Sequence, residues 1–311
     1  MTNKEKCFVS AVIYVHNAGT RIEEFLSSII NNLEENFEHS EIICVNDSSS
    51  DNSVDIIERV SGRSGSVSIS VVNMSYYHGL EAAMEAGTDL SIGDFIFEFD
   101  NTILDFDQSM IMEIYRRALT GADIVSASPD KKEALSSRIF YSVFDRFSDL
   151  KYQMTTESFR ILSRRAVNRI SSASRSIPYR KAMYAGCGLK TENIKYTITH
   201  NDQSRKDVKE KKYRKNLAID TLILFTRVGY SFSLCMTSMM MFISVFMIIY
   251  TLAVYFLGHP IEGWTTTVLF LSVAFLGLFG ILTIIVKYLQ IIVDMIFKRK
   301  HYSYESIQKI R

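Results

Sequence analysis

The chain has 311 residues, of which 47% are hydrophobic, and its 35 Lys and Arg against 34 Asp and Glu give a formal net charge of +1. This length and apolar content fit one large or two small domains with a sizeable core and argue against a disordered chain. The balanced charge gives no reason to expect a nucleic-acid partner. The four widely spaced cysteines lack the C-x-x-C spacing of a zinc site and indicate a reducing compartment.

Residues 1 to about 125 alternate strand-like and helix-like segments. The apolar, strand-like segments are 8–15, 41–46, 67–73, 94–99 and 122–126. The segments with helical periodicity are 22–33, 54–60, 80–90 and 110–119. This alternation predicts an α/β domain with a mostly parallel sheet covered by helices on both faces. Such sheets bind ligands beyond the carboxyl ends of their strands, so the informative residues should directly follow the strands.

Polar residues do follow three of these strands. The first strand leads into 15-VHNAG-19, the second into 46-NDSSSD-51, and the fourth ends at Asp100. Asp47 in the second loop can accept hydrogen bonds from a nucleotide base or ribose, or it can stabilise a turn or a helix N-terminus. Neither G-x-G-x-x-G nor G-x-x-x-x-G-K-[ST] occurs in the chain, which argues against a dinucleotide-binding fold and a P-loop enzyme.

Two long apolar segments lie in the last third of the chain. Residues 232–257 and 265–286 contain no charged side chain, and each segment exceeds the roughly 20 residues that a transmembrane helix needs. Lys and Arg cluster before the first segment and after the second, whereas the connection 258–264 has neither, so we expect both termini to face the cytoplasm. Two buried helices of a soluble domain are the alternative interpretation.

Five segments of the chain, in this order, resemble successive blocks of glycosyltransferase family 2. They are 10-SAVIYVHNAG-19, 44-CVNDSSSDNS-53, 77-YHGLEAAMEAG-87, 93-GDFIFEFDNT-102 and 158-SFRILSRRAV-167. The resemblance implies the GT-A fold, a Rossmann-like α/β domain. Together with the apolar segments it narrows to the branch that is similar to dolichyl-phosphate mannose synthase and bacterial polyprenyl-phosphate glucosyltransferases.

These observations divide the chain into four parts. We expect a GT-A domain over residues 1–202, a basic and amphipathic juxtamembrane segment over 203–230, two transmembrane helices within 231–297, and a basic cytoplasmic tail over 298–311. The small residues of 277-GLFG-280 could form a contact between helices, so a homo-oligomer is expected.

The resemblance implies a nucleotide-sugar site and a catalytic centre at the carboxyl ends of the strands. The nucleotide sugar would contact Val15, His16, Asn17, Asp47 and Gly79. The catalytic residues would be Asp100, Asp105 and Arg160, with Asp100 also binding a divalent cation, Mg or Mn.

The chain departs from the family pattern in this catalytic centre. The family usually has D-x-D followed by Gln-Asp, whereas this sequence has Thr102 for the second acid and Leu104 for the Gln. It also has Ser158 where the family usually has the Asp of an Asp-Phe-Arg-Leu block. Asp100, Asp105 and Arg160 remain. An enzyme with an altered set of metal ligands and a catalytically impaired homologue that acts as a scaffold or regulatory partner are therefore both open.

The acceptor that the resemblance implies is a polyprenyl phosphate in the membrane. Arg164, Lys212 and Arg214 would contact its phosphate, although the two residues of the juxtamembrane segment could equally be anchoring charges. An ionised phosphate attacks the sugar without a general base, so we expect inversion at the anomeric carbon. A processive polysaccharide synthase is disfavoured, because it would need a Q-x-x-R-W block and more spans, and the single tryptophan, Trp264, lies between the two apolar segments.

The sequence thus predicts a multi-pass membrane glycosyltransferase. It would transfer a sugar from a nucleotide-diphosphate sugar to a polyprenyl phosphate on the cytoplasmic face of a bacterial inner membrane.

Overall fold

The computed structural model describes residues 4–130, 157–173, 179–199 and 304–309, together with single positions between 239 and 292. The chain divides into two compact units. The first comprises Met1–Asp145, Leu150–Leu217 and Arg299–Arg311, and the second comprises Arg146–Asp149 and Ala218–Lys298. All the strands and helices named below belong to the first unit.

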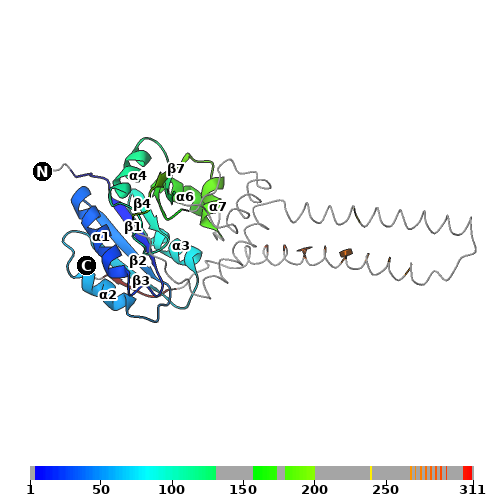
Figure 1. Ribbon diagram of the computed structural model, residues 1–311, viewed down its shortest axis with the longest axis horizontal. Coiled ribbons are helices and arrows are strands. Elements are labelled where there is room, and N and C mark those ends of the chain that lie inside the picture. The colour runs from blue at the N-terminus through cyan, green and yellow to red at the C-terminus, as the bar shows by residue number, and fades with distance from the viewer. Residues whose placement is uncertain are drawn as a thin grey trace, which may run out of the picture. The chain divides into compact units, whose positions relative to one another are not determined.

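The described strands form one eight-stranded sheet in the order β7-β5-β6-β4-β1-β2-β3-β8. Figure 1 labels β1 to β4 and β7 of this sheet. The strands are β1 (Val9–Val15), β2 (Ser40–Asn46), β3 (Ser68–Met74), β4 (Phe95–Phe99), β5 (Ile124–Pro129), β6 (Phe159–Ser163), β7 (Thr191–Tyr196) and β8 (Tyr304–Lys309). β1 is parallel to both β2 and β4, β2 is parallel to β3, and β5 is parallel to β7. β6 runs antiparallel between β4 and β5, and β8 runs antiparallel to β3.

Helices cover both faces of the sheet, as the sequence predicts. They are α1 (Ile22–Asn36), α2 (Ser53–Ser61), α3 (Leu80–Leu90), α4 (Ser109–Leu119), α6 (Arg164–Ala173) and α7 (Arg180–Gly186). The apolar residues of α1, α2 and α4 share one buried cluster with one face of the sheet. Those of α3, α6 and α7 share a second cluster with the other face. The central strands are buried on both faces for this reason, and their near-continuous apolar sequence follows from it.

Helix α3 lies unusually close to the sheet at Gly87. A Cβ atom at this position would lie 2.4 Å from Cγ1 of Val12 in β1 and 2.6 Å from Cγ2 of Val45 in β2. The absence of a side chain therefore lets the helix approach the strands.

Strand β8 was not predicted. Residues 304–309 pair with β3 in an antiparallel register that sets Ser70 opposite Lys309 and Val72 opposite Ile307. This pairing covers backbone groups of β3 that would otherwise form an open edge of the sheet.

The predicted membrane-embedded part cannot be compared in the same way. Apart from single helical positions, residues 231–297 lie outside the described residues, and so does the juxtamembrane segment 203–230. In the portion of the chain that the structure describes, no helix is long and apolar enough to cross a membrane.

Candidate active site

The pairing of β4 with β6 brings the predicted catalytic residues together. Glu98 in β4 lies directly opposite Arg160 in β6, and neither side chain is exposed to solvent. Asp100 follows β4 immediately, so it lies at the carboxyl end of that strand. The structure places Asp100 beside Arg160, whose Nη2 donates a hydrogen bond of 2.7 Å to Oδ2 of Asp100.

Arg160 contacts three carboxylates at once. Its Nη1 donates to Oε2 of Glu98 at 2.8 Å, its Nη2 to Oδ2 of Asp100 at 2.7 Å, and its Nε to Oε2 of Glu157 at 3.1 Å. A guanidinium group is a rigid planar fork, so these three contacts fix its orientation.

A second arginine, which the sequence analysis missed, repeats this arrangement. Arg180 in α7 donates from Nη1 to Oε2 of Glu98 at 2.7 Å and from Nη2 to Oδ1 of Asp100 at 2.8 Å. Its Nε donates to Oε2 of Glu81 in α3 at 3.1 Å. The two guanidinium groups thus share Glu98 and Asp100. We call these six residues the arginine–carboxylate cluster: Glu81, Glu98, Asp100, Glu157, Arg160 and Arg180.

Glu98 is the buried centre of the cluster. Besides the two arginines, Oε1 of Glu98 accepts hydrogen bonds from Oγ1 of Thr88 at 3.1 Å and from the hydroxyl of Tyr184 at 2.8 Å. Four donors therefore satisfy this carboxylate, which is the condition under which a buried charge is tolerated. Burial, followed by the charge of Glu98, raises the pKa of Tyr184 well above its usual value, so the tyrosine keeps its proton and remains a donor.

The cluster also fixes the charge of Asp100. Burial alone would raise the pKa of this carboxyl group, but the charges of Arg160, Arg180 and Lys181 outweigh burial and hold the pKa well below its usual range. Burial would likewise lower the pKa of both arginines, and the neighbouring carboxylates instead raise it well above the usual value. Asp100, Arg160 and Arg180 are therefore ionised at neutral pH.

The oxygen atoms near Asp100 do not fit a divalent cation. Both oxygens of Asp100 accept from guanidinium groups, and Oδ1 of Asn101 accepts from the backbone N–H of Ile103 at 2.8 Å. Thr102 is buried, and Leu104 packs against the hydrophobic core. A hard cation needs about six oxygen ligands. Over the described ranges, no group of three or more His, Cys, Asp or Glu side chains could hold a metal ion.

Asp105 belongs to a separate hydrogen-bonded chain. The hydroxyl of Tyr196 in β7 lies 2.8 Å from Oδ1 of Asp105 and 2.7 Å from Oγ of Ser158. Burial raises the pKa of Tyr196 above its usual value, so this tyrosine is protonated. Asp105 is therefore linked to the residue that stands in the place of the family's Asp. Tyr196 carries no local sequence signal, because its partners lie far away along the chain.

Asp47 connects the predicted nucleotide-binding segments. Its side chain is fully buried, and its carboxylate accepts from the backbone N–H groups of His78 and Gly79, both at 2.8 Å, and from the hydroxyl of Tyr14 at 3.0 Å. Gly79, with φ of 87°, precedes α3 and adopts a backbone conformation that favours glycine. Asp47 thus holds the end of β2 to the start of α3.

The other predicted nucleotide contacts surround Asp47. Val15 is the buried last residue of β1, and Nδ1 of His16 lies 2.7 Å from the carbonyl oxygen of Asp47. Asn17 has a positive φ of 48°, and its Oδ1 accepts from the backbone N–H of Ser50 at 2.9 Å. These contacts join the loops after β1 and β2 at the edge of the sheet where Asp100 also lies.

Arg164 lies at the opposite end of β4 from Asp100. Because β6 is antiparallel to β4, the residue that follows β6 meets the start of β4. There Arg164 donates from Nε to the carbonyl oxygen of Gly93 at 2.9 Å and from Nη2 to that of Ser91 at 2.9 Å. The structure thus does not bring Arg164 to the predicted phosphate site. The other two predicted phosphate contacts, Lys212 and Arg214, lie outside the described residues.

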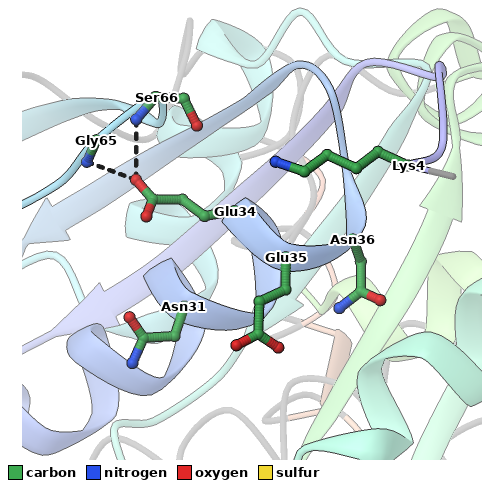
Figure 2. Close-up of a pocket in the computed structure, with 7 residues that line it drawn as sticks. All are labelled: Lys4, Asn31, Glu34, Glu35, Asn36, Gly65 and Ser66. Carbon is green, nitrogen blue, oxygen red and sulfur yellow. Dashed lines mark hydrogen bonds between the residues drawn. The ribbon is translucent and has the colours of Figure 1, made fainter. Parts of the chain in front are cut away.

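An open hollow at the amino-terminal ends of the strands is lined by residues that make structural hydrogen bonds. It lies between the end of α1 and the loop before β3, where Oε1 of Glu34 accepts from the backbone N–H groups of Gly65 at 2.6 Å and Ser66 at 2.9 Å (Figure 2). These residues precede β2 and β3, whereas Asp47 and Asp100 follow their strands. The hollow is therefore separate from the candidate site.

The chain belongs to glycosyltransferase family 2. Residues 10–171, more than half of the chain, match the profile of the family described as glycosyl transferase family 2. The sheet, with its mostly parallel strands and helices on both faces, is that of the GT-A fold, and the protein is a glycosyltransferase.

Several curated proteins are similar in sequence. The uncharacterized glycosyltransferase sll0501 of Synechocystis sp. is 27% identical over 188 residues, which is 58% of this chain and 58% of that protein. The uncharacterized glycosyltransferase YkcC of Bacillus subtilis is 23% identical, over 83% of this chain and 81% of its own length. The bactoprenol glucosyl transferase of Shigella phage SfX is 25% identical, over 86% of this chain and 88% of its own length.

Two solved structures are also among the proteins that resemble this chain. The mannosyltransferase PcManGT from Pyrobaculum calidifontis, in complex with GDP-Man and Mn2+, has a TM-score of 0.48 and 13% identity, with 88% of this chain and 87% of that chain covered. The glucosyl-3-phosphoglycerate synthase from Mycobacterium tuberculosis, in complex with Mn2+, UDP and phosphoglyceric acid, has a TM-score of 0.48 and 14% identity, with 70% and 78% covered.

Proposed function

We propose that this glycosyltransferase transfers a sugar from a nucleotide-diphosphate sugar to a polyprenyl phosphate, at the cytoplasmic face of a membrane that its two apolar segments span. The observation that carries the proposal is the similarity to the bactoprenol glucosyl transferase, which covers 86% of this chain. Such a match cannot be confined to residues 10–171, so it extends into the apolar C-terminal third. A bacterial inner membrane is the location that fits these relatives.

The pairing of β8 with β3 supports the proposed topology. Strands that share backbone hydrogen bonds must lie on the same side of a membrane, and β8 follows the two apolar segments whereas β3 precedes them. The chain between them would therefore cross the membrane an even number of times. Two crossings, by residues 232–257 and 265–286, satisfy this condition.

The chemistry of a phosphate acceptor suits this candidate site. An ionised phosphate oxygen is already a nucleophile, so the replacement of the family's Asp by Ser158 does not remove a required base. The attacking oxygen would form a bond to the anomeric carbon as the bond to the nucleoside diphosphate breaks, which inverts the configuration. Asp105, Tyr196 and Ser158 would order the strand ends around the acceptor rather than accept a proton.

A transfer assay tests the proposal directly. The full-length protein in detergent is incubated with polyprenyl phosphate and, in turn, labelled UDP-glucose, UDP-N-acetylglucosamine and GDP-mannose. We expect one donor to give a labelled, organic-soluble glycolipid that does not form without the lipid, with an inverted anomeric centre by NMR. Absence of product from every donor, under conditions where the protein is folded, would contradict the proposed acceptor or donor class.

A second candidate function is that of a catalytically impaired scaffold or regulatory partner. It is favoured by the replacement of an acid by Thr102 and of the family's Asp by Ser158, and by the ion pairs that occupy Asp100. The two candidates differ in their response to Tyr196→Phe. For a transferase, this substitution lowers transfer and weakens the cellular phenotype together. A scaffold without transferase activity keeps its cellular phenotype.

A further inference from the structure

Two features near the end of β4 affect the charge around Asp100. The positions that would complete a cation site carry Thr102 and Leu104, neither of which is an acid or an amide. At the same place, Arg180 brings a positive charge to Oδ1 of Asp100, opposite the contact of Arg160 with Oδ2. Asp100 thus has two positively charged partners, and Asp105 is the other acid of the family pattern that remains.

The shape of the guanidinium groups makes these contacts difficult to replace. Each arginine uses Nη1 to hold Glu98 and Nη2 to hold Asp100, and the two nitrogens belong to one rigid plane. Neither arginine can turn away from Asp100 without disturbing its bond to Glu98. Because Glu98 is fully buried, the loss of these partners would leave an uncompensated charge in the interior.

A cation that approached Asp100 with both arginines in place would meet like charges. It would lie beside two guanidinium nitrogens that are themselves 2.7 and 2.8 Å from the carboxylate oxygens. The repulsion is strong because Asp100 is mostly buried, with 8% of its side chain exposed, and buried charges are poorly screened. Asp105 offers no simple alternative, since its Oδ1 already contacts Tyr196.

We propose that this enzyme binds its nucleotide-sugar donor without a divalent cation at Asp100, because Arg160 and Arg180 occupy that carboxylate permanently. The arginines neutralise Asp100 and keep the end of β4 rigid. They do not bind the diphosphate themselves, since each is shared among three carboxylates and is almost completely buried. A second consequence is that the affinity for the donor does not depend on divalent metal. This consequence rests on the proposed donor class.

The first test uses electron paramagnetic resonance to measure direct binding of Mn2+ to the full-length protein in detergent. We expect that the wild-type protein binds no more Mn2+ than the Asp100→Asn variant, with or without added UDP or GDP. Stoichiometric Mn2+ binding by the wild-type protein that is lost in Asp100→Asn would overturn the proposal. Titration of the wild-type protein alone already decides whether a site exists, so the result does not depend on the folding of the variant.

The second test compares nucleotide affinity with and without metal. UDP and GDP are titrated calorimetrically in EDTA and in millimolar Mg2+ or Mn2+, and we expect dissociation constants that agree within about twofold. A tenfold or greater tightening by the cation that is absent in Asp100→Asn would overturn the proposal. If neither nucleotide binds under any condition, the proposed donor class fails, whereas the Mn2+ titration still decides the state of Asp100.

Discussion

Substitution of Arg180 by alanine tests whether the arginine–carboxylate cluster holds the domain together. The change removes ion pairs to Glu81, Glu98 and Asp100 and leaves Arg160 as the remaining cationic partner of the last two. Breaking a buried pair costs about 3–5 kcal/mol. We take the lower end because Arg160 remains. A loss of about 3 kcal/mol lowers Tm by about 6–12 °C, at roughly 2–4 °C per kcal/mol for a domain of this size.

The thiol of Cys44 provides a suitable readout of this loss. Cys44 lies in β2 and is buried, and burial raises the pKa of its thiol to about 12, so it reacts with a maleimide only when the domain opens. The labelled peptide is quantified by mass spectrometry along a temperature ramp. Arg63→Ala is the matched control, because Arg63 pairs with Glu23 at 3.6 Å and both side chains are largely exposed, so we expect no resolvable change in Tm.

A small effect of the Arg180 substitution would refute this reasoning. If Arg180→Ala melts within about 2 °C of the wild-type protein, the cluster does not hold the domain, and its ion pairs exchange readily with solvent. The argument that a cation cannot displace these arginines would then lose its physical basis.

Three further predictions follow from the same contacts. Gly87→Ala should destabilise the domain by about 1–3 kcal/mol, because its Cβ would clash with Val12. Gly62→Ala is the control and should melt like the wild-type protein, because the atom nearest to its Cβ is 3.5 Å away; Cys44 labelling along a temperature ramp measures both variants. The ion pairs hold the pKa of Asp100 below its unfolded value of about 3.9, so the stability they provide is present above pH 3.9 and is lost as the pH falls below it. Urea denaturation between about pH 5 and pH 3 should therefore show a smaller loss of unfolding free energy for Asp100→Asn than for the wild-type protein. Tyr196→Phe should cost about 1 kcal/mol of stability, measured by urea denaturation. Because Tyr196 joins Asp105 to Ser158, the substitution should also lower kcat for transfer more than it changes the KM for the donor, and an unchanged kcat would contradict the positioning role of Tyr196.

The first half of the fold could be predicted from the sequence because its signals are local. Apolar runs of strand length alternate with helical periodicity up to β5, and the observed strands β1 to β5 match the predicted segments within a few residues. β6, β7 and β8 escaped prediction as strands because their positions depend on partners far away in the chain. β8, for example, pairs with β3 across more than two hundred residues.

The same distinction separates the predicted and the missed residues of the site. Asp100 stands at the end of an apolar run, and Arg160 lies in a recognisable block, so both were predicted. Arg180 lies in a segment without such a pattern, and Glu81 lies in the block 77–87, in which only Gly79 was predicted to be a site residue. The roles of both arise when α7 and α3 meet the end of β4. The sequence showed that an acid is missing at Thr102, but it did not show what compensates for the charge of Asp100.

The charge on Asp100 explains why the acid at position 102 is not required here. In a site where Asp100 must hold a cation, a second acid supplies further ligands and charge. With Arg160 and Arg180 on its two oxygens, Asp100 is already neutralised, and a second carboxylate would be an additional buried charge without a partner. Thr102, which is buried, avoids that penalty. Thr102→Asp should therefore destabilise the domain without creating Mn2+ binding. Recovery of Mn2+ binding by this single substitution would mean that the arginines yield to a cation once enough acids are present.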